Sequence, residues 1–238
     1  MRLATALWLH PPKYQPRIAG LFYDYNMTKP DPQTEHTAEP LHPVMQRRFL
    51  RKHLRQQRKA LSTDSQEQHA LALNQHLSRN KLFKRSKRIG AYLAADGEID
   101  PSYLIEGAWL ANKKIYLPIL APFSLRIYFA PYTVNSKMKL NRFHIAEPDV
   151  HPKHWLKPQQ LDLILMPLVG FDKSGNRLGM GGGFYDRSLN FMHFRNRAFK
   201  PYLIGLAHEL QKVDRLPVQT HDVPLKIIAT ELQLHICQ

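Results

Sequence analysis

An apolar run that leads directly into a cluster of glycines constrains this chain more than any other feature. Residues 161–166 are apolar apart from Asp162, as expected for a strand that is buried on both faces of a sheet. Glycine has no Cβ, so backbone N–H groups in a glycine cluster can approach an anion closely. The sequence therefore predicts a phosphate-binding loop just after this strand, built on Gly175, Gly179, Gly181, Gly182 and Gly183.

The rest of the chain alternates between helical and strand-like patterns. Phe49, Leu50 and Leu54 lie on one helical stripe among cations, and the segment Ser62-Thr63-Asp64, with Gln66 and Glu67 three residues on, is typical of a capping box. We expect helices over residues 45–61, 63–79 and 101–112 and after Gly183, and strands at 88–93, 114–117, 126–130, 161–166, 202–206 and 226–230. This order predicts a single-domain, three-layer α/β/α fold with a mainly parallel central sheet.

Residues 1–44 differ from the rest of the chain. They contain seven of the eighteen prolines and show no sustained helical or strand period. We expect an irregular, largely disordered extension here, followed by a folded domain over residues 45–238. Met45 opens the first clear helical pattern, so it could also be the true start of translation.

Composition limits the cellular context. No stretch approaches the roughly 18 apolar residues of a membrane helix, and the only cysteine, Cys237, allows neither a disulfide nor a cysteine-based zinc site. We expect a cytoplasmic monomer. None of the thirteen histidines lies in a recognised ligand spacing, so the sequence predicts no histidine-bound metal.

The net charge of +15 raises a different functional class. Two runs rich in Lys and Arg, at 47–59 and 81–88, carry much of the excess, and such runs occur on solvated helix faces, at sites for small anions and at nucleic-acid interfaces. A basic nucleic-acid-binding protein is therefore an alternative to an enzyme. No interleaved aromatic and basic motif for stacking bases is present.

The spacing of the glycines excludes the two common nucleotide loops, G-x-x-x-x-G-K-[ST] and G-x-G-x-x-G. The side chains around the glycines still suit a phosphate and a metal ion. Arg177 could neutralise phosphate oxygens through two hydrogen bonds. Asp186 offers the hard oxygen ligands that Mg²⁺ prefers.

The whole segment resembles the signature of the 5-formyltetrahydrofolate cyclo-ligase family. That signature is P-x-x-x-F-D-x-x-G-x-R-L-G-x-G-x-G-[YF]-Y-D, and this chain meets every fixed position between Pro167 and Asp186. The likeness extends from about residue 47 to 230 and is closest to the bacterial branch. A second match is Arg47-x-x-x-Arg51, where many relatives have Lys at the first position.

The resemblance implies an ATP- and Mg²⁺-dependent enzyme. Family members convert 5-formyltetrahydrofolate into 5,10-methenyltetrahydrofolate by phosphorylating the formyl oxygen, after which N10 attacks the activated carbon and phosphate leaves. A ligase of the same fold that acts on another formamide is a further alternative. By the resemblance, ATP contacts Arg47, Arg51, Arg177, Gly179, Gly181, Gly182, Gly183 and Tyr185. The folate, possibly with a polyglutamate tail, contacts Leu93, Glu98, Met180, Phe184 and Tyr185; Asp186 and Asp222 hold Mg²⁺.

Overall fold

The structure is a computed structural model that describes residues 42–121, 124–194, 201–220 and 222–237. By its internal contacts the chain divides into residues 1–40 and residues 41–238. Residues 1–41, which make up most of the expected irregular extension, lie outside the described residues. Residues 43 and 44, which we assigned to that extension, belong instead to the first helix, α1 (Pro43–Lys59).

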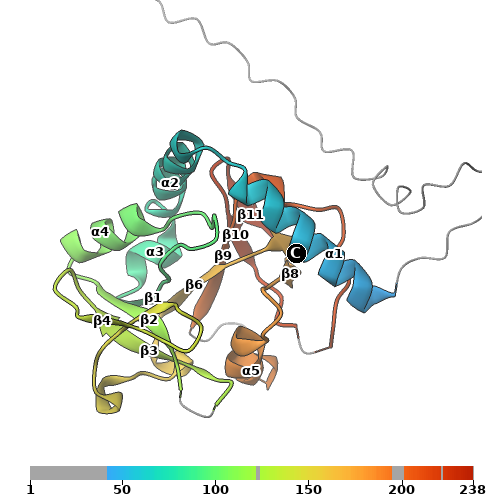
Figure 1. The fold of residues 1–238 in the computed structure, drawn as a ribbon. Helices are drawn as coiled ribbons and strands as arrows, with labels where there is room; N and C mark the ends of the chain where they lie inside the picture. The colour runs from blue at the N-terminus through green and yellow to red at the C-terminus, as the bar shows by residue number, and fades with distance from the viewer. Residues whose placement is uncertain (1–41, 122–123, 195–200, 221, 238) are drawn as a thin grey trace, which may run out of the picture. The chain divides into compact units, whose positions relative to one another are not determined.

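A seven-stranded sheet forms the centre of the second unit (Figure 1). Its strand order is β11-β10-β9-β6-β1-β2-β3; the five central strands are parallel, and each edge strand runs antiparallel to its neighbour. This confirms the mainly parallel sheet. The strands are β1 (Arg88–Gly90), β2 (Lys114–Leu120), β3 (Ile127–Tyr132), β6 (Leu163–Pro167), β9 (Tyr202–Leu206), β10 (Ile227–Ala229) and β11 (Leu234–Ile236).

Two hydrophobic clusters lie on the two faces of this sheet. Leu163 and Leu165 of β6 belong to one cluster and Ile164 and Met166 to the other, so this strand is buried on both sides as expected. The first face packs against α2 (Thr63–Leu77), α3 (Lys81–Arg85) and α4 (Ser102–Leu110). These helices pack their apolar sides against the sheet and so cover this face, because both faces of a parallel sheet are apolar and must be buried.

The second face of the sheet is covered by shorter elements. It packs against the short α5 (Phe184–Leu189) and against Phe171 of a small hairpin, β7 (Gly170–Phe171) and β8 (Arg177–Leu178). A second hairpin pairs β4 (Met138–Leu140) with β5 (Ala146–Pro148). The described 3₁₀ turns are η2 (Pro152–His154), η3 (Pro158–Gln160), η4 (Asn190–Phe194) and η5 (Glu209–Gln211).

Several expected boundaries shift. The strand expected over 88–93 ends at Gly90, and the helix expected to reach residue 79 ends at Leu77. The expected capping box is wrong: Ser62 is the N-cap and accepts a hydrogen bond from Ser65 N, whereas the Gln66 side chain donates to Leu61 O. With Ser62 as the cap, the third helical residue is Ser65. Its side chain is too short to accept a hydrogen bond from the backbone N–H of Ser62, as a capping box requires.

The buried side chain of Arg58 joins α1 to the carboxyl end of β6. Its guanidinium donates to the carbonyl of Leu168, just beyond β6, at 3.1 Å, and to the carbonyl and carboxylate of Asp96, both at 2.9 Å. Burial by itself would raise the pKa of Asp96, but hydrogen bonds from three cations of α1 outweigh it and hold that pKa well below its ordinary value. Arg58 therefore positions the turn that carries Glu98 relative to the glycine loop.

We expect Arg58→Met to lower the free energy of unfolding by about 3 kcal/mol or more, because it removes one partner of a buried ion pair. Arg55→Met on the same helix is the matched control: Arg55 pairs with the same Asp96 carboxylate but has a side chain that is 39% exposed. Its loss should stay within about 1 kcal/mol. Urea unfolding of both variants checks this, and equal losses would contradict the role given to Arg58.

Candidate active site

The glycine loop follows the hairpin β7–β8 and ends at α5. Gly181 has φ of +99° and Gly183 has φ of +64°, a region that L-residues with a Cβ adopt only with strain. The hairpin turn before the loop is held by Asp172, whose carboxylate accepts from the backbone N–H groups of Ser174 and Asn176. Asp172 of the signature is therefore a structural residue that fixes where the loop begins.

Arg177 and Asp186, at the two ends of the signature, form an ion pair. The Arg177 side chain is buried; one terminal nitrogen donates to Asp186 Oδ1 and the other to the carbonyl of Val223. Burial lowers the pKa of Arg177, while the charges of Asp186 and Asp222 oppose that shift. Among the described residues only Arg177 binds Asp186, and it uses Oδ1 alone, so Oδ2 remains open to another ligand.

The second pair of predicted residues, Arg47 and Asp222, is also joined directly. Arg47 Nη1 lies 2.8 Å from Asp222 Oδ2, and Nη2 lies 3.4 Å from Oδ1. Nη1 also donates to Pro217 O at 2.7 Å, and Gln219 N donates to Asp222 Oδ2 at 2.9 Å. Asp222 is thus fully engaged by protein donors at Oδ2, and Arg47 fixes the C-terminal segment against α1.

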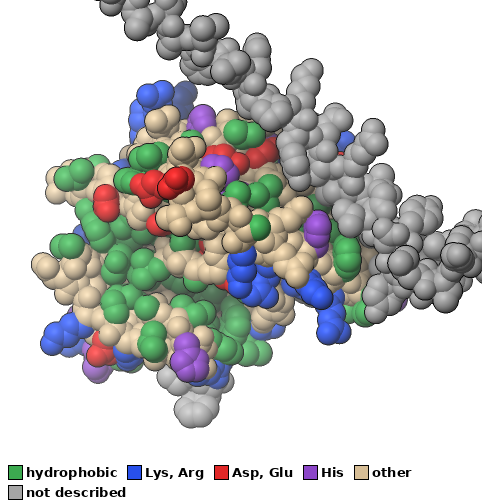
Figure 2. All heavy atoms as spheres, turned by 45° about the horizontal axis from the view of Figure 1, so that its top comes forward, with side chains coloured by type: hydrophobic (Ala, Val, Ile, Leu, Met, Phe, Trp, Pro, Cys, Tyr) green, Lys and Arg blue, Asp and Glu red, His purple; other side chains and the backbone are tan. Residues whose placement is uncertain are grey.

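Arg51, one turn after Arg47, faces a cationic hollow. This hollow of about 440 Å³ lies between α1 and the glycine loop and is lined by Arg48, Arg51, Lys52, Arg55, Gln56, Lys59 and Met180. Figure 2 shows Lys and Arg side chains gathered on this side of the molecule. Arg51 Nε donates to Gly179 O at 2.9 Å, which ties the hollow to the loop. So many cations around one hollow favour an anionic ligand.

Glu98 lies near enough to Tyr185 for its charge to act on the tyrosine hydroxyl. The Glu98 side chain is 14% exposed; Oε1 lies 3.7 Å from Arg58 Nη2, and Oε2 accepts from Ala95 N at 3.3 Å. Burial raises the pKa of Glu98, and the Arg58 charge only partly offsets that shift. The Tyr185 hydroxyl is buried without a hydrogen-bond partner among the described residues, and the Glu98 charge adds to burial in raising its pKa. An unpaired buried hydroxyl is costly unless a ligand satisfies it.

The apolar residues assigned to the substrate divide between exposed and packed positions. Leu93 is 37% and Met180 is 53% exposed, so neither is a core residue. Phe184 packs partly against the second core cluster and lies edge-to-face with Phe143. The sequence analysis assigned no role to Arg58 or Arg187. Arg187 donates to the carbonyl of Gly182 and lies over the Phe184 ring, so it closes the glycine loop onto α5.

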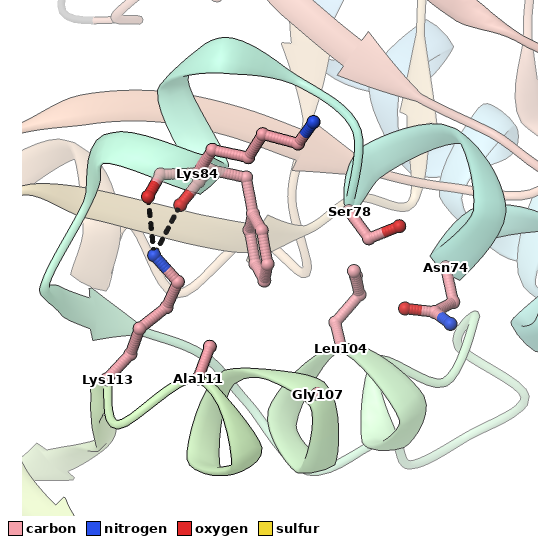
Figure 3. Close-up of a pocket in the computed structure, with 8 residues that line it drawn as sticks. Asn74, Ser78, Lys84, Leu104, Gly107, Ala111 and Lys113 are labelled. Atoms are coloured by element: carbon pink, nitrogen blue, oxygen red, sulfur yellow. Dashed lines mark hydrogen bonds between the residues drawn. The ribbon is translucent and has the colours of Figure 1, made fainter.

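A second hollow, of about 340 Å³, lies between α2, α3 and α4, away from the residues of the signature (Figure 3). Its lining includes Lys113, whose ammonium already donates to the carbonyls of Phe83, Lys84 and Ser86. With its three protons engaged, this ammonium has none left for a phosphate. The candidate active site is therefore the region between α1, the turn at 96–98 and the glycine loop.

Comparison with known proteins matches this chain to one family. Residues 44–231 match the model of the 5-formyltetrahydrofolate cyclo-ligase family. The 5-formyltetrahydrofolate cyclo-ligase of Haemophilus influenzae is 40% identical over 76% of this chain and 96% of its own length. That of Escherichia coli is 37% identical over 74% of this chain and 96% of its own length.

Solved structures agree with the sequence relatives. The 5,10-methenyltetrahydrofolate synthetase of Aquifex aeolicus superimposes with a TM-score of 0.68 at 28% identity, over 81% of this chain and 93% of that one. The corresponding enzyme of Mycoplasma pneumoniae gives a TM-score of 0.60 at 28% identity, over 78% and 98%. The fold and the matched length therefore agree with the sequence signature.

Proposed function

We propose, from the premise that this chain belongs to the 5-formyltetrahydrofolate cyclo-ligase family, that it converts 5-formyltetrahydrofolate into 5,10-methenyltetrahydrofolate with consumption of ATP. The γ-phosphoryl group of ATP passes to the formyl oxygen, N10 attacks the formyl carbon, and inorganic phosphate leaves. A formamide carbonyl is a poor electrophile and its oxygen a poor leaving group, and phosphorylation corrects both faults. The enzyme must then align the γ-phosphate with the formyl oxygen and neutralise developing charge.

The observation that carries this proposal is the Tyr185 hydroxyl, which is buried and has no hydrogen-bond partner among the described residues, near the largely buried Glu98 carboxylate. The pterin ring presents a 2-amino group and N3–H, two adjacent donors that a carboxylate can accept together. We propose that Glu98 binds these donors and that Tyr185 completes its hydrogen bonding only when a ligand is present. Leu93, Met180 and Phe184 would supply the apolar contacts.

We assign the phosphates of ATP to the glycine loop and the cationic hollow. Gly179, Gly181, Gly182 and Gly183 offer close backbone approach, and Arg51 links the loop to the cations of α1. Because both terminal nitrogens of Arg177 already have acceptors, we propose that it serves ATP chiefly by holding Asp186 in place. Arg47 would act in the same indirect way through Asp222.

The cations on the exposed side of the hollow support a second anionic contact. Arg48, Lys52 and Lys59 line the hollow from α1, and we propose that they attract the carboxylates of a folate glutamate tail. These cations suit a glutamate tail better than a single-stranded nucleic acid. Among the described residues that line this hollow there is no aromatic side chain on which a base could stack.

Magnesium fits the site through Asp186. Its Oδ2 is open while Oδ1 is fixed by Arg177, and a carboxylate oxygen is the hard ligand that Mg²⁺ takes, directly or through water. The ion would supply charge neutralisation at the phosphates. Asp222 is a weaker candidate because Arg47 occupies both of its oxygens.

None of the described helices could span a membrane. We propose that the protein is a monomer and acts in the cytoplasm.

The activity itself is tested by following the absorbance of the methenyl product with 5-formyltetrahydrofolate, ATP and Mg²⁺. We expect one ADP and one phosphate per product, and Arg177→Ala should reduce turnover about 100-fold or more because Asp186 loses its fixed position. Arg85→Ala, an exposed change on α3, is the control. Product without ATP would contradict the proposal, and so would tight, salt-sensitive DNA binding with no product.

Glu98→Gln should raise KM for 5-formyltetrahydrofolate about tenfold or more, because one charged acceptor for two donors is lost. The free energy of unfolding at pH 8 should not fall. Burial raises the pKa of Glu98, so its charge costs stability as pH rises through that pKa, and glutamine avoids this cost. Glu106→Gln, exposed on α4, is the control; an unchanged KM, or a loss of stability, would remove the assigned role.

Asp186→Asn and Asp222→Asn should separate the metal ligand from the structural carboxylate. We expect Asp186→Asn to raise the Mg²⁺ concentration for half-maximal turnover about tenfold or more. Both variants should lower the free energy of unfolding, because Arg177 and Arg47 each keep a buried charge without its carboxylate partner, but Asp222→Asn should leave the Mg²⁺ requirement unchanged. Magnesium titration and urea unfolding of both variants check this, and the reverse pattern would assign the ion to Asp222.

A further inference from the structure

Three potential metal ligands, remote from each other in sequence, meet beyond the carboxyl ends of β9 and β10. His69 comes from α2, His208 follows β9 and Glu231 follows β10. One ligand atom from each lies within 4.8 Å of the other two. The two imidazoles approach through their Nδ1 atoms, which are 2.8 Å apart, and His69 Nδ1 lies 3.8 Å from Glu231 Oε1.

The hydrogen bonds around His208 fix which of its nitrogens could bind a metal. His208 Nε2 lies 3.2 Å from the carbonyl of Gly97, which can only accept, so Nε2 carries the proton. In the neutral ring Nδ1 then carries a lone pair, which accepts a hydrogen bond from His69 Nδ1 at 2.8 Å and which an ion could take over. A metal-binding histidine commonly donates its other ring N–H to a backbone carbonyl in this way.

Glu231 is oriented in a similar manner. Its Oε2 accepts from Glu209 N at 2.9 Å, which leaves Oε1 facing His69. The backbone carbonyl of the same residue lies 3.1 Å from His76 Nε2. Both the carboxylate and the buried imidazole are therefore held in place by neighbours outside the cluster, before any ion arrives.

His69 is the ligand through which a metal ion could enter the cluster from solvent. The His208 side chain is fully buried and that of Glu231 is 9% exposed, but His69 is 22% exposed. In a tetrahedral zinc site with Zn–N bonds of 2.0–2.1 Å, neighbouring ligand atoms lie about 3.3 Å apart. The two Nδ1 atoms would separate by about half an ångström, and Glu231 Oε1 would approach His69 by a similar distance and His208 by up to about 1.5 Å. The His69 proton would move to Nε2.

We propose that His69, His208 and Glu231 form a second metal site, which binds Zn²⁺ or a similar transition-metal ion with a water as fourth ligand. Two imidazoles and one carboxylate suit such ions, whereas Mg²⁺ prefers an all-oxygen shell. The site is separate from Asp186 and does not depend on the proposed reaction. It cross-links α2 to the ends of two strands and, through His208 and Gly97, to the turn that carries Glu98.

The test is a Zn²⁺ titration of the full-length protein by calorimetry and by competition with a chromophoric chelator, in millimolar Mg²⁺. We expect one equivalent to bind with Kd of about 1 µM or tighter and to raise Tm. Co²⁺ in the same protein should give the visible absorption of a tetrahedral complex. If the wild-type protein bound no equivalent of Zn²⁺ at this affinity, or if bound Co²⁺ gave an octahedral spectrum, the proposal would be overturned.

His69→Gln and Glu231→Gln should each weaken Zn²⁺ binding about 100-fold while circular dichroism shows the fold retained. Both residues are preferred to His208, whose full burial makes its variants prone to unfolding. His154→Gln, exposed on η2, controls for weak binding by the other histidines and should leave affinity unchanged. Equal affinity in His69→Gln and His154→Gln would show that the ion binds elsewhere.

Discussion

The structure depends first on the buried guanidinium of Arg58. Its hydrogen bonds reach the chain just after β6 and the turn at Asp96, so one side chain sets α1, the glycine loop and the Glu98 turn in register. Gln211 supports the same point, because its amide donates to the carbonyls of Leu168 and Val169. A buried cation of this kind contributes little net stability, but its loss leaves several buried acceptors without partners.

Around that frame the site consists of charges that are already paired. Arg177 holds Asp186, and Arg47 holds Asp222, so two cations and two carboxylates sit near one another without a ligand. Such pairing fixes the side chains before substrates arrive, which lowers the cost of organising them during phosphoryl transfer. Among the described residues, the Tyr185 hydroxyl, Arg47 Nε and Asp186 Oδ2 have no protein partner, and a ligand or an ion could satisfy the hydroxyl and the carboxylate oxygen.

Much of this could be predicted from local pattern. The apolar run at 161–166 and the alternation of elements indicated a mainly parallel sheet, and the comparisons confirm the family that the segment from Pro167 to Asp186 resembles. Boundaries were less predictable: Ser62 rather than Thr63 or Asp64 caps α2, and its hydroxyl accepts a hydrogen bond from Ser65 N. The small hairpins β4–β5 and β7–β8 were missed because their strands are only two or three residues long.

The sequence by itself determined the family, the glycine loop and the types of side chain around it, because these depend on short-range spacing along the chain. Only the tertiary structure decided the partners. Arg47 meets Asp222 across 175 positions, and His69 meets His208 across 139. Their contacts arise from how helices cross the carboxyl ends of parallel strands, and no local period encodes that geometry. The same reason explains why the sequence pattern made Arg58 look like one more cation on a basic helix, although its side chain is fully buried.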